Sequence, residues 1–264
     1  MAKLGAEDAL ARESNALGRD FSEALARGLN VVAAFGPDAR AMTLSDMARR
    51  LNLPRATTRR ALLTLVHLGY AEEDGRLFRL TPKVLSLAAA YLGSSLATSV
   101  FQPACEALSS QHGETFSLAV LDGEDAVMIA YATPRRMYGE TGGIGLRMPA
   151  YSAAVGRVLL AGLPAERRDA YLKKLNPVAI TPHTVTDKPT LKRILAQVDA
   201  EGYALAEEEA ELGFRALAVP IVHPTGGVRF ALNVGSLIRS SHRDIRDYLP
   251  ILQETARRLE SQLL

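Results

Sequence analysis

Residues 44–82 read LSDMARRLNLPRATTRRALLTLVHLGYAEEDGRLFRLTP, and they predict the fold of the N-terminal part of the chain. It predicts a short helix that ends at Leu51, a tight turn over residues 52–54, and a second helix that begins at Arg55 and ends near residues 68–69. Asp74-Gly75 lies between two short runs of strand-forming residues and predicts a β-hairpin. Helix, turn, helix and hairpin in this order are typical of a winged helix-turn-helix, whose second helix enters the major groove of DNA.

The second of these helices has an apolar side and a basic side. At about 100° per residue, the apolar side is expected to pack on the first helix, which leaves the basic side for DNA. Arginine can bind O6 and N7 of guanine bidentately, and threonine can contact a phosphate or a thymine methyl group. The expected buried residues are Thr58, Ala61, Leu62, Leu65 and Leu68. The expected DNA contacts are Arg55, Ala56, Thr57, Arg59 and Arg60 in the helix, with Arg76 and Arg79 at the hairpin.

The distribution of charge agrees with this prediction. Residues 1–83 hold 13 Lys and Arg against 10 Asp and Glu, whereas the rest of the chain holds 18 against 19. Residues 49–60 alone contain five arginines and no acid. A basic face by itself is typical of a solvated helix. A basic excess confined to the predicted DNA-reading segment indicates a local phosphate-binding surface.

Length and composition bound the rest of the chain. The 264 residues, 48% of them hydrophobic, are enough for two domains. No apolar run approaches the roughly 18 residues of a membrane span, so we expect no membrane partner. The single cysteine, Cys105, cannot form an intramolecular disulfide and is typical of a cytoplasmic protein. Its helical spacing from Phe101 and Leu108 predicts a buried structural thiol.

Helices and strands alternate along the remainder, which predicts an α+β fold with helices packed on an antiparallel or mixed sheet. The expected helices span residues 21–35, 82–95, 100–111, 152–161, 165–175, 189–201 and 241–263. The expected strands of the second half span residues 116–121, 126–132, 203–206, 217–222 and 228–237. We therefore expect an N-terminal extension (1–20), a winged helix-turn-helix domain (21–82), a linker helix (83–98) that is also a candidate dimerisation helix, and a second domain (99–264).

Several short stretches along the chain carry a family resemblance. They are ARGL at 26–29, residues 53–70, FRLTP at 78–82, RMPAY at 147–151, GRVLLA at 156–161, GYA at 202–204 and GFRALAVP at 213–220. With these stretches the chain resembles the IclR-type transcriptional regulators from about residue 21 to residue 264. Within that family, residues 147–161 and TPHTVTD at 181–187 are most similar to regulators of aromatic-acid catabolism, the protocatechuate and β-ketoadipate group.

The resemblance implies that the second domain is a GAF-like effector-binding domain, joined by the linker helix to the winged helix-turn-helix. It implies a homodimer or a dimer of dimers on double-stranded operator DNA. It also implies that a small-molecule effector binds between the loop and helix at about residues 146–156 and the later strands. Amides at a helix start are unpaired donors at the positive end of the helix dipole, which suits a carboxylate.

The residues at this implied site favour one class of effector. At strand positions that correspond to family ligand contacts, Ala206 and Ala216 replace polar residues often found there, which favours a larger, flatter and more apolar effector such as an aromatic carboxylic acid. Arg135, Arg136 and Arg147 are candidates to pair with its carboxylate. The expected effector contacts are Tyr131, Leu146, Arg147, Met148, Ala153, Ala154, Val155, Ala206, Ala216, Phe230, Asn233 and Gly235.

Two alternatives stay open. The same kind of regulator could sense a short aliphatic or keto acid, or the chain could be a small-molecule enzyme with an appended DNA-binding domain. Ser152 lacks the flanking glycines of a nucleophile elbow, and no histidines and cysteines have the spacing of zinc ligands. We therefore expect no catalytic residue, metal ion or cofactor. The three glutamates at 207–209 are expected to form a solvated turn.

Overall fold

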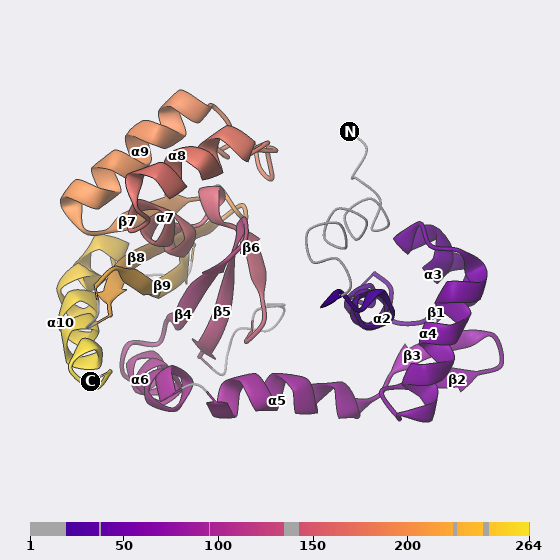
Figure 1. The fold of residues 1–264 in the computed structure, drawn as a ribbon. Coiled ribbons are helices and arrows are strands. Elements are labelled where there is room, and N and C mark those ends of the chain that lie inside the picture. The colour runs from indigo at the N-terminus through magenta and orange to yellow at the C-terminus, as the bar shows by residue number, and fades with distance from the viewer. Residues whose placement is uncertain are drawn as a thin grey trace. The chain divides into compact units, whose positions relative to one another are not determined.

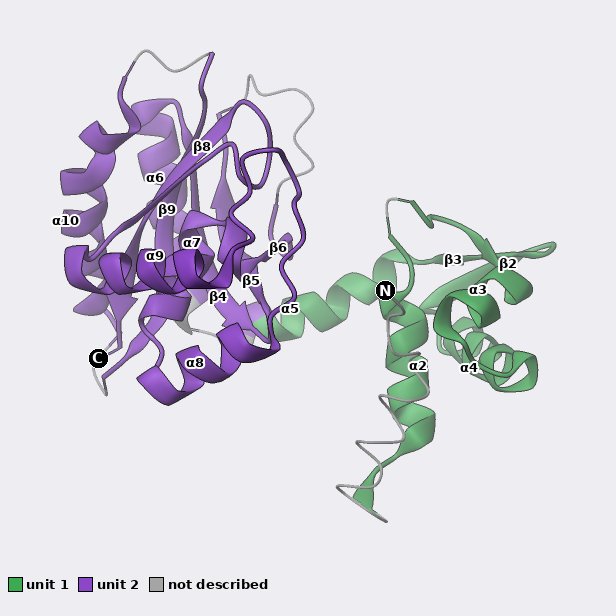
Figure 2. Cartoon of the chain, turned by 90° about the horizontal axis from the view of Figure 1, so that it is seen from above, with its two compact units in different colours: residues 1–91 green, residues 92–264 purple. Residues whose placement is uncertain are grey.

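The computed structural model describes residues 20–36, 38–94, 96–134, 143–223, 226–239 and 243–263. The chain divides into two compact units between Tyr91 and Leu92 (Figures 1 and 2). The predicted α+β class and the N-terminal helix-turn-helix are both confirmed. The extension over residues 1–19, with Arg135 and Arg136, lies outside the described residues.

In unit 1, helices pack beside a small antiparallel sheet with the strand order β1-β3-β2. Its elements are α2 (Glu23–Ala33), β1 (Met42–Thr43), α3 (Leu44–Leu51), α4 (Arg55–His67), β2 (Ala71–Asp74), β3 (Leu77–Leu80), the 3-10 turn η2 (Pro82–Val84) and the start of α5 (Leu85–Ser94). The predicted linker helix over residues 82–95 therefore begins as a 3-10 turn, in which Pro82 occupies a first-turn position that needs no amide donor.

Local sequence sets the turn between α3 and α4. Thr43 caps α3, because its Oγ1 accepts a hydrogen bond from the Asp46 amide at 3.2 Å. Asn52 ends α3 in the left-handed conformation, with φ of 51°, and reverses the chain before α4. This is the turn that the sequence predicts at residues 52–54.

The core of unit 1 follows the predicted helical phase. Helix α3 packs on α4, where Met47 of α3 and Thr58 and Leu62 of α4 are all 0% exposed. Leu68 was predicted to share this buried side, but it is 49% exposed. Leu68 is the C-cap residue of α4, and it lines an apolar groove of unit 1.

Unit 2 is built on one antiparallel sheet with the strand order β6-β5-β4-β9-β8-β7. Its strands are β4 (Thr115–Asp122), β5 (Asp125–Ala132), β6 (Arg147–Pro149), β7 (Ala204–Glu207), β8 (Phe214–Val222) and β9 (Val228–Leu237). Its helices are α6 (Leu96–His112), α7 (Ala154–Ala161), α8 (Ala165–Lys174), α9 (Lys188–Glu201) and α10 (Leu249–Glu260), with 3-10 turns η3 (Ala150–Ser152) and η4 (Ile245–Tyr248).

The two faces of this sheet have different cores. On one face, α6 and α10 cover large side chains such as Phe116 and Leu118. On the other, α7 covers small residues such as Ala119 and Ala218, and α9 packs behind α7 (Figure 1). Alternation along each strand separates the two sets of side chains. Because the residues beneath α7 are small, that face leaves room for a cavity.

The final helix was expected over residues 241–263, but α10 begins only at Leu249, where Pro250 is tolerated in the first turn, and η4 precedes it. Across the described ranges, no single helix is long and apolar enough to cross a membrane. By length and composition alone, one bent pair of helices within these ranges, residues 82–93 and 98–112, is long and apolar enough when the two are taken together.

Candidate functional site

The outer side of α4 is basic and exposed. Arg55, Ala56, Arg59 and Arg60 are exposed, and Thr57 is half-buried. The helix begins after Pro54 without a side-chain cap and without an acid in its first turn. Its first amides and the positive end of its dipole are therefore available to an anionic group such as a phosphate.

The arginines around this helix fall into two groups. Arg49, Arg50 and Arg79 form ion pairs with Asp46, Asp38 and Asp74, respectively. Arg55, Arg59, Arg60 and Arg76 form none within the described part of unit 1. Binding of a phosphate by this second group would therefore break no existing ion pair.

The hairpin turn lies one residue later than predicted. Asp74 pairs with Leu77, so the two-residue loop consists of Gly75 and Arg76. Gly75, with φ of 63°, takes the left-handed conformation that the first loop position of a tight hairpin requires. Arg76 consequently stands at the exposed tip of the hairpin, and Arg79 lies on β3 beside Asp74.

An apolar groove of about 790 Å³ adjoins α4 in unit 1. Leu25 and Leu29 of α2 line it and are 64% and 54% exposed. Thr57 and Arg60, both predicted to contact DNA, also line this groove, whereas Arg59 does not. On the basic side of α4, Thr57 and Arg60 therefore lie next to the groove that α2 also lines, whereas Arg59 lies outside it.

Unit 2 contains a cavity of about 270 Å³ on the α7 side of its sheet. Nine of the twelve predicted effector contacts line it, namely Tyr131, Leu146, Met148, Ala153, Ala154, Val155, Ala206, Ala216 and Asn233. These residues come from the start of α7 and its N-cap, from five of the strands and from the residue before β6. The fold therefore gathers into one cavity residues that are more than 100 positions apart in the chain.

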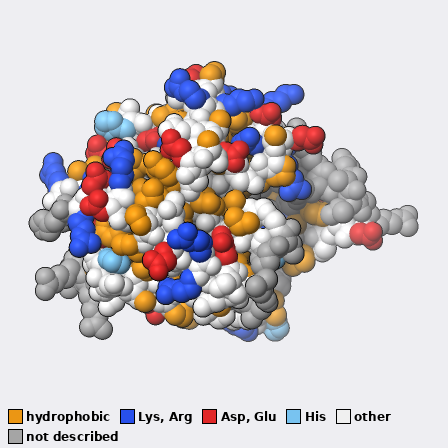
Figure 3. Space-filling view, turned by 90° about the vertical axis from the view of Figure 1, so that its left-hand side faces the viewer, with side chains coloured by type: hydrophobic (Ala, Val, Ile, Leu, Met, Phe, Trp, Pro, Cys, Tyr) orange, Lys and Arg blue, Asp and Glu red, His pale blue; other side chains and the backbone are white. Residues whose placement is uncertain are grey.

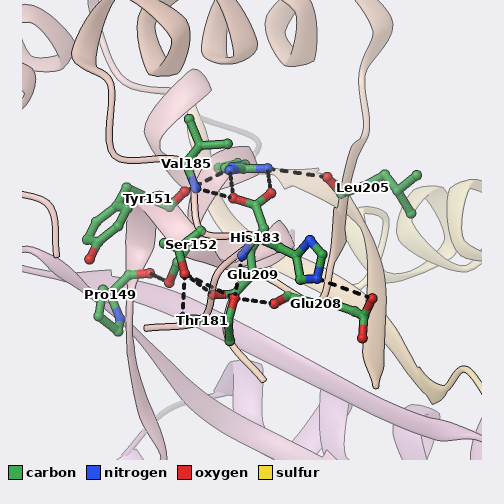
Figure 4. A network of polar contacts seen from close by, with 11 residues as sticks. Pro149, Tyr151, Ser152, Thr181, His183, Val185, Leu205, Glu208 and Glu209 are labelled. Carbon is green, nitrogen blue, oxygen red and sulfur yellow. Dashed lines mark hydrogen bonds and ion pairs between the residues drawn. The ribbon is translucent and has the colours of Figure 1, made fainter. Parts of the chain in front are cut away.

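The start of α7 forms one wall of the cavity. Its N-cap residue, Ala153, has no side-chain acceptor, and the hydroxyl of neighbouring Ser152 donates to the Pro149 carbonyl at 3.0 Å instead (Figure 4). All residues of α7 are buried. Buried first-turn amides without a cap favour a bound anion at this position.

Three predicted contacts do not line the cavity. Arg147, on the edge strand β6, instead donates to Asp122 at 2.7 Å and to Asp125 at 3.2 Å. Phe230 points to the other face of the sheet, where its ring meets that of Phe101 edge-on at 5.1 Å. Gly235 lies behind Phe214, where a Cβ atom would overlap the Phe214 ring. Of these three, only Gly235 shapes the cavity, by leaving room for an aromatic wall residue.

Sequence reasoning missed several lining residues, namely Thr115, Ser117, Met128, Ser152, Glu209, Ala210, Glu211 and Phe214. Thr115 and Ser117 lie on β4 opposite Gly235 and Asn233 of β9. The alternation of polar and large apolar residues in Thr115-Phe116-Ser117-Leu118 marks the two faces of β4 and could have found them.

Asn233 is the least satisfied polar group of the cavity wall. The side chain is 5% exposed, and its Nδ2 donates to Ser117 Oγ at 3.3 Å. Its Oδ1 is buried and has no hydrogen-bond partner among the described residues. An unpaired buried amide oxygen costs free energy unless a ligand supplies the missing group.

The acidic run at 207–209 is not a solvated turn throughout, because Glu209 is 8% exposed. Its carboxylate receives two hydrogen bonds from Arg157, at 2.6 and 2.7 Å, and a third from the Val185 amide at 3.0 Å (Figure 4). Arg157 lies in α7 and is itself buried. This ion pair requires a partner 52 residues away, which local sequence cannot show.

Cys105 is buried as predicted, and burial raises its pKa to about 12, so the thiol is unsuited to nucleophilic chemistry. No group of three or more His, Cys, Asp or Glu side chains within the described residues could hold a metal ion. On the face shown in Figure 3, acidic and basic side chains are mixed over an apolar background. The described residues of that face therefore form no patch of a single charge sign.

Comparison with known proteins finds curated relatives along most of the chain. It is 39% identical to the Pca regulon regulatory protein of Pseudomonas putida, over 92% of this chain and 85% of that protein. It is 34% identical to the p-hydroxybenzoate hydroxylase transcriptional activator of Acinetobacter baylyi, over 92% of each chain.

Solved structures agree with these relatives. A putative transcriptional regulator from Rhodococcus matches with a TM-score of 0.80 and 41% identity, over 92% of this chain and 98% of that one. An IclR homologue from Microbacterium hydrocarbonoxydans, solved in complex with 4-hydroxybenzoate, matches with a TM-score of 0.76 and 29% identity, over 91% and 99%.

Two family descriptions match along the chain. Residues 24–75 match the IclR helix-turn-helix domain, and residues 89–261 match the C-terminal domain of the bacterial transcriptional regulator IclR. The chain therefore belongs to the IclR family of bacterial transcriptional regulators.

Proposed function

We propose that this regulator of a catabolic operon senses an aromatic carboxylic acid with a single ring, bound in the cavity beside α7. The observation that carries the proposal is the combination of an apolar cavity with the uncapped, buried start of α7. Apolar walls such as Met128, Met148 and Phe214 suit a ring, and the first amides of α7 suit a carboxylate.

The size of the cavity favours one ring. An engineered apolar cavity of about 150 Å³ is enough to bind benzene. The cavity of unit 2, about 270 Å³, has room for a benzene ring with a carboxylate and small ring substituents. A short keto acid would leave much of this volume empty. Ala206 and Ala216 would offer such an acid no side-chain hydrogen bond.

The relatives support the same class of effector. The names of two of them refer to the Pca regulon and to p-hydroxybenzoate hydroxylase, and a solved IclR homologue holds 4-hydroxybenzoate. Family membership also decides against the enzyme alternative, because the relatives are transcriptional regulators.

A calorimetric titration tests the effector proposal. Benzoate, 4-hydroxybenzoate and 3,4-dihydroxybenzoate are titrated into the full chain, with glyoxylate and pyruvate as the short alternatives. Saturable binding of a ring acid to one site per chain supports the proposal. Binding of the keto acids alone would replace it with the aliphatic alternative.

We propose that operator DNA is read by α4 and the hairpin. Arg55, Ala56, Thr57, Arg59 and Arg60 would face the major groove, and Arg76 and Arg79 would hold the flanking backbone or minor groove. The absence of ion pairs at Arg55, Arg59, Arg60 and Arg76 within the described part of unit 1 supports these roles. We propose that the N-terminal extension ends at residue 20, the winged helix-turn-helix domain at residue 82 and the linker helix at residue 98. We also propose that the protein is cytoplasmic.

We further propose that the chain acts as a homodimer or a dimer of dimers, with a second copy covering the apolar surface of unit 1. Leu25, Leu29, Leu85, Leu87 and Tyr91 are between 47% and 69% exposed, which is unusual for an isolated soluble unit. Sedimentation velocity of the wild type and of Leu29→Glu tests this proposal. A wild-type chain that stays monomeric at micromolar concentration would contradict it.

A further inference from the structure

The segment over residues 181–185, between α8 and α9, binds the segment that follows β7. Thr181 and Thr184 are both 8% exposed, although threonine at a loop position is usually solvated. The Thr184 hydroxyl donates to the Glu209 carbonyl at 2.6 Å, and the Thr181 hydroxyl donates to the Glu208 carbonyl at 2.5 Å (Figure 4). Two consecutive carbonyls after β7 are therefore held by two side chains of one distant loop.

Both hydroxyls make further hydrogen bonds, and that of Thr184 is used completely. Thr184 Oγ1 also accepts from the amides of Ile180 at 3.0 Å and Thr181 at 2.9 Å. Thr181 Oγ1 also accepts from the His183 amide at 3.1 Å. A hydroxyl that donates once and accepts twice has no capacity left, so Thr184 is fixed in one rotamer, and Thr181 is held by one donated and one accepted bond.

A second attachment comes from α7. Arg157 binds the Glu209 carboxylate through two nitrogens, and the Val185 amide donates to the same carboxylate. Glu209 is therefore held from α7 and from residues 181–185 at once. Charge-assisted bidentate hydrogen bonds of this kind fix geometry as well as adding stability.

The backbone between these attachments has an unfavourable conformation. Glu208 has a positive φ of 56°, which is uncommon for a residue with a side chain. Its carboxylate accepts from the Gly213 amide at 2.7 Å, and its own amide donates to the Phe214 carbonyl at 2.7 Å. Such a conformation persists only where the surroundings impose it.

The segment held in this way forms a wall of the cavity. Glu209, Ala210 and Glu211 all line it, whereas Thr181, Thr184 and Arg157 do not. We propose that Thr181, Thr184 and Arg157 are positioning residues, which set the place of the wall at 209–211 and thereby the affinity for the effector. This inference rests on the proposed function of the cavity.

Thr184→Val is the sharpest test, with Thr184→Ser as its matched control. Valine keeps the shape of the side chain and removes three hydrogen bonds, whereas serine keeps the hydroxyl. Calorimetry with 4-hydroxybenzoate should show affinity about tenfold weaker for Thr184→Val and close to wild type for Thr184→Ser. Thr181→Val, which removes two hydrogen bonds, is the second variant if Thr184→Val does not fold.

Hydrogen–deuterium exchange without any ligand separates this inference from the proposed function. Amides over residues 207–213 should exchange faster in Thr184→Val than in the wild type, while Thr184→Ser leaves them protected. Unchanged exchange over 207–213 in both valine variants would overturn the inference, even if the wild type binds ring acids. Exchange over residues 207–213 that is as fast in Thr184→Ser as in Thr184→Val would overturn the inference as well. If the wild type binds no ring acid while exchange changes as expected, the positioning of the wall stands and the proposed effector fails.

Discussion

Asn233 of β9 lies directly opposite Ser117 of β4, and its amide nitrogen donates to the Ser117 hydroxyl at 3.3 Å, while its Oδ1 has no partner among the described residues. This pair sits in the wall of the cavity in unit 2. A protein that buries an unpaired amide oxygen loses stability in the empty state and recovers it when a ligand donor arrives.

Asn233→Ala should therefore weaken binding of a hydroxylated ring acid while changing the free energy of unfolding of the empty protein by only about 1 kcal/mol. We expect an affinity roughly tenfold lower, the equivalent of one hydrogen bond. Calorimetry gives the affinity, and urea unfolding gives the stability.

Ser236→Ala is the control for this variant. Ser236 is 1% exposed, its hydroxyl also has no hydrogen-bond partner within the part of the chain that the structure describes, and it stands on the opposite face of β9. It should leave the affinity unchanged. Equal losses of affinity in the two variants would mean that Asn233 does not contact the effector.

Gly235→Ala should reduce the volume available to the effector. The new methyl group would overlap the Phe214 ring, and that ring lines the cavity. We expect weaker binding of ring acids in a titration. The double variant Gly235→Ala with Phe214→Leu should recover part of the affinity, and no recovery would argue against displacement of Phe214 as the cause.

The alternation of strand β9 shows how far sequence reasoning reached. The sequence predicts Phe230, Asn233 and Gly235 of this strand as effector contacts. Residues 230 and 233 have opposite parity in a strand, so they cannot share a face. The period of two residues alone predicts that Phe230 faces the core, where its ring meets that of Phe101.

Other parts of the site were beyond local reasoning. The periodicity of α4 predicted that helix almost to the residue, because helix phase depends on neighbours three and four positions away. The pairing of β4 with β9 joins residues more than 110 positions apart, and the burial of Glu209 depends on Arg157. Contacts of this kind arise from topology and leave no signal in a local window.

Salt dependence should distinguish the arginines of unit 1. Arg76→Ala should lower the slope of log K against log salt by about 0.9, the value for one lost phosphate contact. Arg79→Ala should change it less, because Arg79 already binds Asp74. Fluorescence anisotropy with operator and with unrelated duplexes measures both.

Arg60→Ala should act differently, by removing the preference for operator over unrelated DNA. Arg49→Ala, which loses only an exposed ion pair with Asp46, serves as the control and should bind as the wild type does. Undiminished operator preference in Arg60→Ala would show that this residue belongs to the apolar groove rather than to the DNA interface.

The burial of Cys105 predicts how the stability of the folded protein changes at alkaline pH. Burial raises its pKa from 9.0 to about 12, so folding favours the neutral thiol. The resulting contribution to stability is complete below pH 9 and is lost as the pH rises from 9 toward 12. Iodoacetamide at pH 8 should therefore leave the native thiol unmodified and label it only after denaturation, as mass spectrometry would show. Rapid labelling of the native protein would contradict this burial.

We propose that the cavity beside α7 binds a monocyclic aromatic acid, and Ala216→Leu is the decisive variant for this claim. The larger side chain would fill part of a cavity of about 270 Å³ from the β8 wall. In calorimetric titrations with 4-hydroxybenzoate and 3,4-dihydroxybenzoate, we predict one saturable site per chain in the wild type and no detectable binding in a folded Ala216→Leu. Ring-acid binding that is the same in both proteins, or absent from the wild type, would contradict the claim.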